Sequence, residues 1–314
     1  MHMQEYENDN GRERPHLLLI DGMALLFRAF HATAVHGRFM RNREGVPTNA
    51  VQGFIGHSLS AQSIFRPTHL AVCWDMGAFT FRNELYEGYK ANRPAPPEEM
   101  GPQFEMGRES AWLLGWKSFG IDGVEADDVI GSLVYRWKDE ADITIISGDK
   151  DLLQLLSPGV RIAFMKKGHT VYDVYTYDRF KEEYGFEPSQ FVDLKAFTGD
   201  SSDGYPGVRG IGPKTATKLI LDHGTVDGVL AELDQLKPAV RKKIDDELVM
   251  LKLSRELAEI DCHIPIPGEL DELLVPPYSR ETAKALEAED YGTASRQLLN
   301  LFPLEETPEE WPFG

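Results

Sequence analysis

Acidic side chains follow the apolar segments of this chain at several places. Asp21 comes directly after the run 17–20, and Asp75 comes directly after the run 71–74. Three short motifs add further carboxylates: Glu125, Asp127 and Asp128 in Glu-Ala-Asp-Asp, Asp149 and Asp151 in Gly-Asp-Lys-Asp, and Asp200 and Asp203 in Thr-Gly-Asp-Ser-Ser-Asp. Each position alone has a structural explanation, because Asp often caps a helix and acids are favoured in a first helical turn.

The nine carboxylates together indicate a metal centre. If the apolar runs are parallel strands, their carboxyl ends meet at one edge of the sheet, where open α/β proteins bind ligands. So many negative charges would repel one another by roughly several kcal/mol, even at an effective dielectric of about 20. Bound cations relieve this repulsion, and an all-oxygen donor set favours Mg²⁺ or Mn²⁺ over zinc. Two such ions about 3.5–4 Å apart commonly catalyse phosphodiester hydrolysis.

The pattern of the chain predicts the sheet that this centre needs. Apolar runs alternate with amphipathic segments, which is typical of an α/β protein with a mostly parallel sheet. We expect strands at 16–20, 69–74 and 142–147, and two more at 160–165 and 170–175 that could pair as a hairpin. We expect helices at 49–63, 105–117, 126–138, 188–197, 213–222, 238–245 and 247–258.

Composition excludes several classes of protein. Two cysteines, Cys73 and Cys262, exclude a disulfide scaffold and a four-cysteine zinc site. There is no Walker loop, no Ser-His-Asp or Cys-His arrangement, and no apolar run long enough to span a membrane. A chain of 314 residues can bury a core without a disulfide or a structural metal. We therefore expect a cytoplasmic protein.

The net charge is acidic, and its distribution matters. Lys and Arg number 33 against 51 Asp and Glu, which gives −18, whereas nucleic-acid binders usually present a basic face. The nine carboxylates account for half of this charge, and bound metals would reverse the local field. The stretch 303–314 adds an acidic tail that contains four glutamates and no basic residue. An anionic partner is therefore compatible with the sequence.

Two other segments have unusual composition. Residues 1–15 are polar and aperiodic, and we expect a disordered extension there. Residues 87–102 contain four prolines and mixed charges, and they are too many for an ordinary connection. Such a loop either covers a functional site or is disordered, and its composition does not separate these two interpretations.

Residues 204–221 carry a second functional motif. Gly-Ile-Gly-Pro at 210–213 leads into a helix with its proline in the first turn, a favoured position. Glycines allow close approach of the backbone to a partner, and a helix N-terminus offers free N–H groups to a phosphate. We interpret the motif as a helix-hairpin-helix that binds the DNA backbone, rather than an ordinary Gly-Pro helix start with a solvated basic face. The stretch has no acid, and its candidate contacts are Arg209, Gly210, Gly212, Lys214, Thr215 and Lys218.

These motifs, in this order, resemble the bacterial 5′-3′ exonuclease and flap endonuclease family, which includes the N-terminal domain of DNA polymerase I. The resemblance runs from about residue 16 to about residue 267. Besides the acidic motifs and the hairpin, it rests on Leu-Ile-Asp-Gly at 19–22, Leu-Phe-Arg-Ala-Phe-His at 26–31, Pro-Thr-Asn-Ala-Val at 47–51, Thr-Phe-Arg at 80–82 and Tyr-Lys-Ala-Asn-Arg at 89–93.

The resemblance implies a fold and a division of the chain. It implies a PIN-like, Rossmann-like nuclease core over 16–185, with a helical arch at about 83–110 that admits the 5′ strand. A helix-three-turn-helix DNA-binding subdomain is implied over 186–290, followed by a C-terminal segment over 291–314. No polymerase segment follows the match, so we expect a stand-alone nuclease that acts as a monomer.

The resemblance also implies roles for residues. The nine carboxylates would hold the metals directly or through water. Lys90 would meet the scissile phosphate, Arg82 and Arg93 would lie close by, and Arg28 would contact DNA. Backbone carbonyls of Val208, Gly210 and Ile211 would bind a potassium ion. The implied substrates are DNA with 5′ flaps, nicks or 5′ ends and RNA primers annealed to DNA, cut during replication primer removal and repair.

Two departures from the family pattern leave every acidic position intact. Tyr205 stands in Gly-Tyr-Pro-Gly-Val-Arg, where the family pattern has Asn-Ile-Pro-Gly-Val-Pro, and Phe27 replaces a frequent Tyr. Two alternatives stay open: a non-catalytic protein that binds branched DNA, and a PIN-type ribonuclease without a preference for DNA. The intact carboxylates weigh against the first, and the hairpin and the 87–102 loop weigh against the second.

Overall fold

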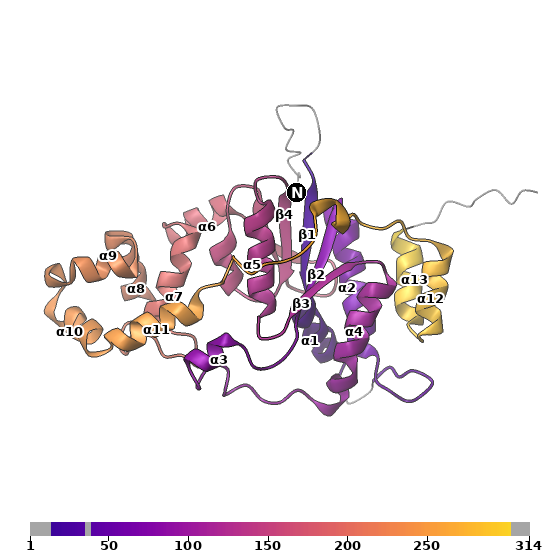
Figure 1. Ribbon diagram of the computed structural model, residues 1–314, viewed down its shortest axis with the longest axis horizontal. Coiled ribbons are helices and arrows are strands. Elements are labelled where there is room, and N and C mark those ends of the chain that lie inside the picture. The colour runs from indigo at the N-terminus through magenta and orange to yellow at the C-terminus, as the bar shows by residue number, and fades with distance from the viewer. Residues whose placement is uncertain (1–13, 35–38, 303–314) are drawn as a thin grey trace, which may run out of the picture.

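A six-stranded sheet forms the centre of the molecule, and helices cover both of its faces (Figure 1). The computed structural model describes residues 14–34 and 39–302, so the acidic tail and nearly all of the expected N-terminal extension lie outside the described residues. The strand order is β3-β2-β1-β4-β5-β6, and all neighbours are parallel except the antiparallel pair β5 and β6. The predicted mostly parallel sheet is confirmed. The strands are β1 (His16–Asp21), β2 (His69–Asp75), β3 (Lys117–Ile121), β4 (Asp142–Ser147), β5 (Val160–Met165) and β6 (Tyr172–Tyr175).

The helices fall along the whole described chain, and none of them is long and apolar enough to cross a membrane. The α-helices are α1 (Gly22–Thr33), α2 (Asn49–Phe65), α3 (Phe81–Leu85), α4 (Gly101–Leu113), α5 (Ala126–Trp137), α6 (Tyr177–Tyr184), α7 (Phe191–Thr198), α8 (Pro213–His223), α9 (Val226–Ala231), α10 (Pro238–Asp246), α11 (Leu248–Ala258), α12 (Arg280–Ala288) and α13 (Gly292–Leu301). Short 3-10 turns are η2 (Glu98–Met100), η3 (Asp151–Leu155), η4 (Pro188–Gln190), η5 (Leu233–Gln235) and η6 (Leu270–Leu273).

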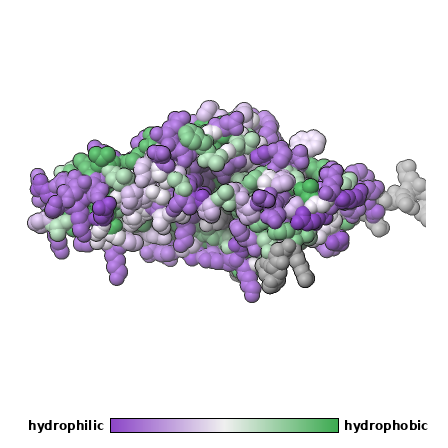
Figure 2. Space-filling model, turned by 90° about the horizontal axis from the view of Figure 1, so that it is seen from below, coloured by the Kyte–Doolittle hydropathy of each residue, from purple (hydrophilic) through white to green (hydrophobic). Residues whose placement is uncertain are grey.

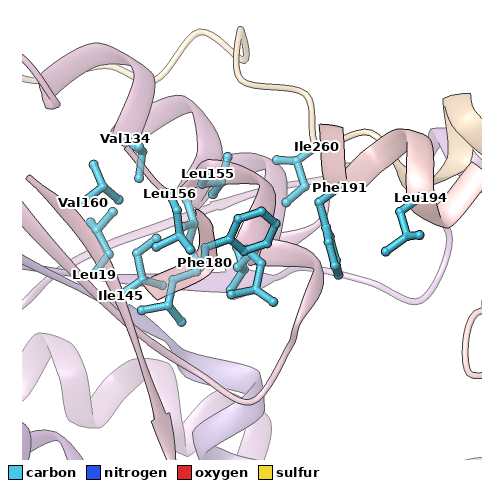
Figure 3. Close-up of a cluster of buried hydrophobic side chains, with 14 of the residues drawn as sticks. Leu19, Val134, Ile145, Leu155, Leu156, Val160, Phe180, Phe191, Leu194 and Ile260 are labelled. Carbon is cyan, nitrogen blue, oxygen red and sulfur yellow. The ribbon is translucent and has the colours of Figure 1, made fainter. Parts of the chain in front are cut away.

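The side chains of β1 alternate between two cores, as the period of a strand requires. Leu17 and Leu19 lie in the cluster that contains the buried face of α5, whereas Leu18 and Ile20 lie in the cluster that contains α1 and α2. Both sets are fully buried. The first cluster continues from the sheet to the helices that follow it, through Phe180 and its neighbours (Figure 3). Burial of both faces of β1 therefore fixes the position of its C-terminal end.

We expected a helix at 105–117, but the helix lies earlier in the chain and the edge strand β3 follows it. Helix α4 begins earlier, at Gly101 with Pro102 in its first turn, and ends at Leu113. Gly115 then adopts a left-handed φ of 73°, which stops the helix. Of the five residues of β3, Phe119 alone is buried. Because this strand lies at the edge of the sheet, its sequence lacks the apolar run that predicts an inner strand.

The segment expected as a helical arch, at about 83–110, is helical only near its ends. Residues 83–85 belong to α3 and residues 98–110 belong to η2 and α4, but residues 86–97 form turns and irregular backbone. Pro94, Pro96 and Pro97 remove backbone donors and disfavour helix in the residues before them. The segment nevertheless docks on the rest of the protein, because the backbone N–H of Lys90 donates to the Asp203 carbonyl at 2.7 Å.

After α11 the chain returns to the sheet. Helices α8, α9 and α10 extend from one end of the molecule, and α12 and α13 lie at the opposite end (Figure 1). The backbone N–H of Val275 donates to the Thr68 carbonyl beside β2, and Leu286 and Leu298 join the core of α1 and α2. The last two helices therefore complete the core around the sheet, although we expected residues up to 290 in the helical subdomain.

Candidate active site

Seven of the nine predicted carboxylates line one pocket of about 510 Å³. The pocket lies beyond the carboxyl ends of β1, β2 and β4, and the surface seen from this side is hollowed and hydrophilic near its middle (Figure 2). Four cations, from three separate segments, also line it. The acids are Asp21, Asp75, Glu125, Asp127, Asp149, Asp151 and Asp200, and the cations are Lys90, Arg93, Lys150 and Lys195.

At Asp21 and Asp75 a structural hydrogen bond and a place in the pocket wall occur together. Asp21 caps α1 by accepting from the Ala24 backbone N–H at 2.9 Å, and it also accepts from the Ser147 hydroxyl at 2.7 Å. Asp75 accepts from the backbone N–H of Ala126 at 2.8 Å, at the start of α5. These bonds fix the carboxyl groups at the pocket wall and leave oxygen lone pairs free.

The pocket holds more negative charge than its cations neutralise. Asp21, Asp75, Asp127 and Asp149 form no ion pair within the described residues. Burial raises the pKa of Asp21 to about 7, and the charges of Asp75 and Asp149 add to this shift. Burial, the Asp149 charge and the Asp21 charge likewise raise the pKa of Asp127. Mutual repulsion of this kind favours either protons or cations in the pocket.

Lys195 is a central residue of the pocket that our sequence analysis missed. Its ammonium group lies 2.6 Å from Asp151 Oδ1 and also bonds Asp200. Burial and the Asp149 charge raise the pKa of Asp151 to about 7 although Lys195 opposes them. The pKa of Asp200 falls to about 2, because its bonds to Lys195 and Ser202 outweigh burial. A lysine five residues before Asp200, at the end of a helix, is the available sequence signal.

Cations from the segment 86–97 pair with two other acids. Lys90 Nζ lies 2.8 Å from Glu125 Oε2, and Arg93 Nη2 lies 2.6 Å from Asp203 Oδ1. The buried Tyr89, which we also missed, donates its hydroxyl towards both acids, at 3.1 Å and 3.3 Å. Burial opposes the charged form of Glu125, but Lys90 and Arg82 outweigh it and lower the pKa of Glu125. Lys90 and Arg93 place this loop against the pocket wall, and we refer to residues 86–97 as the cover.

Three of the predicted metal-binding and catalytic residues lie outside the pocket wall. Arg82, expected near the scissile phosphate, is buried and donates two hydrogen bonds of 2.7 Å to Asp128, expected as a metal ligand. Arg82 also donates to the carbonyls of Leu257 and Glu259, so this ion pair joins α3 and α5 to the end of α11. Asp203 faces Arg93 and Tyr89 instead of the pocket. In this structure these three side chains bond partners outside the pocket wall, and their roles stay predictions.

The predicted DNA-contact residues occupy two separate surfaces. In the hairpin, Gly212 caps α8, and Lys214 is exposed at the first turn. Two cations of the hairpin have acidic neighbours that lie outside residues 204–221. Lys218 pairs with Asp222 at 2.8 Å, and Arg209 lies 3.9 Å from Glu247. Arg28 lies on α1 and donates to the carbonyl of Lys166 at 2.5 Å.

Two of the candidate potassium ligands already accept hydrogen bonds from the protein. Val208 and Ile211 are buried, and the Val208 carbonyl accepts from the backbone N–H of Ile211 at 3.0 Å. The Gly210 carbonyl accepts from Lys243 Nζ at 2.7 Å. The remaining hairpin contact, Thr215, is half-buried, and its backbone N–H donates to the Gly212 carbonyl.

No three Asp, Glu, His or Cys side chains in the described part of the chain are arranged to ligate one metal ion as they stand. The lining acids are instead held by helix caps, by Lys195 and by Lys90. The donor set itself consists of carboxylate oxygens, which is the chemistry that Mg²⁺ and Mn²⁺ prefer. The pocket therefore fits hard divalent ions by its chemistry, and Glu125, Asp151 and Asp200 would have to exchange their lysine partners before they join the ligands.

Comparison with known proteins agrees with this geometry. The chain matches the family model of the 5′-3′ exonuclease N-terminal resolvase-like domain over residues 16–185 and that of the 5′-3′ exonuclease C-terminal SAM fold over residues 186–281. It is 49% identical to a 5′-3′ exonuclease of Bacillus subtilis, over 91% of this chain and 96% of that protein. It is 39% identical to DNA polymerase I of Bacillus caldotenax over 86% of this chain, but it spans 31% of that protein's length.

Solved structures show the same fold. The T5 5′-exonuclease with divalent zinc ions bound superposes with a TM-score of 0.63, at 24% identity, over 91% of this chain and 99% of that one. The catalytic core of Rad2 in complex with DNA substrate superposes with a TM-score of 0.58, at 14% identity, over 92% of both chains. The family models and the Bacillus subtilis relative place the chain more narrowly: it belongs to the 5′-3′ exonuclease family of nucleases.

Proposed function

We propose that the chain is a structure-specific 5′ nuclease that hydrolyses phosphodiester bonds with Mg²⁺ or Mn²⁺. Its substrates are DNA with 5′ flaps, nicks or 5′ ends and RNA primers annealed to DNA, and it acts as a monomer in primer removal and repair. The observation that carries this proposal is the pocket, in which seven carboxylates from distant segments converge. Membership of the exonuclease family supports the chemistry, and the DNA-bound and zinc-bound structures of the same fold support the ligands.

The acids without a cation partner are the first ligands in this proposal. Asp21, Asp75, Asp127 and Asp149 line the pocket and repel one another. Glu125, Asp151 and Asp200 join them when their bonds to Lys90 and Lys195 are exchanged. Divalent ions in such a site lower the pKa of water and stabilise charge on the attacking and leaving oxygens.

Lys90 and Arg93 hold the reacting phosphate in this proposal. Both side chains line the pocket, and both now bond carboxylates. A phosphate offers each cation an alternative anionic partner, so a substrate can replace Glu125 and Asp203 without leaving the cations unpaired. Lys90 then stabilises the negative charge that builds on the phosphate oxygens during hydrolysis.

The hairpin holds the duplex away from the pocket. The charged side chains of Arg209 and Lys214, beside the start of α8, face solvent. Contacts of this type bind phosphates and carry no sequence information. Selection by DNA structure would then follow from simultaneous binding at the hairpin and under the 86–97 cover.

Product mapping on a 5′-flap substrate labelled at its 5′ end, with Mg²⁺ titrated, tests the proposal. We expect flap-sized and short 5′ products that appear with Mg²⁺ and vanish with EDTA. Asp122→Asn is the matched control for pocket variants, since Asp122 is an exposed carboxylate outside the pocket. Binding of flap DNA without any Mg²⁺-dependent cleavage would favour the non-catalytic alternative, and preferential cleavage of single-stranded RNA would favour the ribonuclease.

A further inference from the structure

A lysine side chain from another helix of the protein binds the hairpin. Lys243, on α10, donates from Nζ to the carbonyl of Gly210 at 2.7 Å, although 33 residues separate the two positions. Gly210 has a left-handed φ of 81°, and a Cβ at this position would lie 3.0 Å from Lys243 Nζ. Glycine therefore serves two purposes here: it permits the turn, and it leaves room for the ammonium group.

This contact stands where the family resemblance placed a potassium ion. Of the three candidate carbonyls, that of Gly210 holds an ammonium group and that of Val208 holds the N–H of Ile211. An ammonium group carries the same charge as K⁺ and donates to carbonyl oxygens. The residues present do not fit a potassium site as they stand, because a side chain already supplies its charge.

Lys243 is also distinct from its neighbours on α10. Lys242 pairs with Asp246, and Arg241 pairs with Asp234 and Asp245. Lys243 forms no ion pair with any acid in residues 14–34 and 39–302, so its charge is not neutralised there. The charge is directed at the hairpin, next to the exposed start of α8.

We propose that Lys243 replaces a monovalent cation at the hairpin and contributes its charge to a DNA phosphate bound there. DNA affinity is then independent of the identity of the monovalent cation in solution. The inference rests on the proposed function, since it takes the hairpin as a DNA-binding surface. Its substrate chemistry is the phosphodiester backbone of duplex DNA, without regard to sequence.

Binding of a fluorescent 5′-flap DNA by the full chain tests this inference. Fluorescence anisotropy is measured in EDTA, so that no cleavage occurs, in KCl, NaCl or tetramethylammonium chloride of equal ionic strength. Tetramethylammonium is too large to enter a carbonyl site. The variants are Lys243→Gln, which removes the charge, Lys243→Arg, which keeps it, and Lys242→Gln, which removes a neighbouring paired charge. Thermal unfolding confirms that each variant is folded.

We expect the unsubstituted protein and Lys243→Arg to bind with equal affinity in all three salts. Lys243→Gln should bind about tenfold more weakly in tetramethylammonium, the loss expected for one phosphate contact at about 0.1 M salt, and K⁺ should restore part of this affinity. Lys242→Gln should remain indifferent to the cation.

Three results would overturn the inference. They are a preference of the unsubstituted protein for K⁺, full affinity of Lys243→Gln in tetramethylammonium, and an equal loss of its affinity in all three salts. Absence of DNA binding by the unsubstituted protein in every salt would instead contradict the proposed function, and this inference with it.

Discussion

The ammonium group of Lys90 lies 2.8 Å from Oε2 of Glu125, so a cation of the cover and an acid of the pocket neutralise each other. Lys90 adopts a left-handed φ of 53°, which costs a non-glycine residue about 1–3 kcal/mol. Its backbone N–H, bonded to the Asp203 carbonyl, holds this conformation. The backbone at this position is therefore constrained so that the side chain reaches the pocket.

Replacing Lys90 should impair the chemical step more than binding. Lys90→Ala removes a charge that would stabilise the reacting phosphate, and we expect kcat to fall by about 10²–10³-fold while KM stays within about threefold. Steady-state kinetics on flap DNA measure both. Lys117→Ala is the control, since Lys117 pairs with Glu272 outside the pocket. A rise in KM at constant kcat would show that Lys90 contributes only to affinity.

Neutralising a pocket acid should separate binding from cleavage. Asp149→Asn and Asp151→Asn each remove a negative charge from the proposed ligand set, and we expect cleavage with Mg²⁺ to disappear while flap binding persists. Single-turnover cleavage and anisotropy measure the two properties, with Asp122→Asn as the unchanged control. Cleavage by either variant at the parental rate would refute the metal assignment.

Lys195 should compete with divalent ions for Asp151 and Asp200. Lys195→Met keeps most of the side-chain volume but removes the ammonium group from both acids. The Mg²⁺ concentration that gives the half-maximal rate should therefore fall, by about threefold or more. A titration of rate against Mg²⁺ measures it. An unchanged or higher requirement would mean that the lysine assists ligation instead of opposing it.

We expect Arg82 to contribute to the stability of the fold and not to the reaction. Arg82→Met leaves Asp128 buried without its partner, which typically costs about 3–5 kcal/mol. Arg93→Met is the matched control: the Arg93 side chain is half exposed, so the loss should be about 1 kcal/mol or less. Urea unfolding measures both free energies. A stable Arg82→Met protein with a greatly reduced rate would restore the catalytic role that the geometry argues against.

The stability of the protein should depend on pH through His57. Burial, together with the charges of His169 and Arg28, lowers the pKa of His57 to about 3, whereas the unfolded value is about 6.5. The neutral ring therefore contributes full stability above pH 6.5, and this contribution is lost as pH falls towards 3, because the unfolded chain alone takes up the proton.

The variant His57→Phe tests this dependence, since phenylalanine keeps a ring against His169 and removes the titration. The free energy of unfolding of the variant, relative to the unsubstituted protein, should rise by about 2 kcal/mol between pH 6.5 and 5. Urea unfolding at the two pH values gives this difference, and the comparison cancels the acids of the pocket. A difference that stays constant with pH would contradict the assignment.

The inner strands were predictable because a strand that is buried on both faces appears in the sequence as an uninterrupted run of apolar residues. β4 and β5 lie at their predicted residues, and β1 and β2 each extend one residue beyond the prediction, to Asp21 and Asp75. β3 was not predictable by the same rule, since an edge strand needs few apolar residues. Helices α12 and α13 also went unpredicted: their buried side chains are few and belong to a core built by distant segments.

The acids of the pocket were predictable from the sequence, and the family resemblance added Lys90 and Arg93, but Lys150 and Lys195 were not predicted. Parallel strands bring their carboxyl ends to one edge, so spacing alone placed Asp21, Asp75 and Asp149 together. The partner of each acid depends on tertiary geometry. Asp128 and Asp127 are adjacent in sequence, yet one faces Arg82 inside the protein and the other lines the pocket, because successive helix residues point in different directions.

The return of the chain after α11 determines which parts of this protein can be removed or extended. Leu286 of α12 and Leu298 of α13 are fully buried in the apolar core of α1 and α2, and α13 packs against the surface of α2. A shortened gene that stops at residue 258 would uncover this surface, and we expect its product to aggregate. A fluorescent or affinity partner attached beyond Phe302 would instead be tethered at the end of the molecule remote from α8 and α10 (Figure 1), and would not obstruct the duplex.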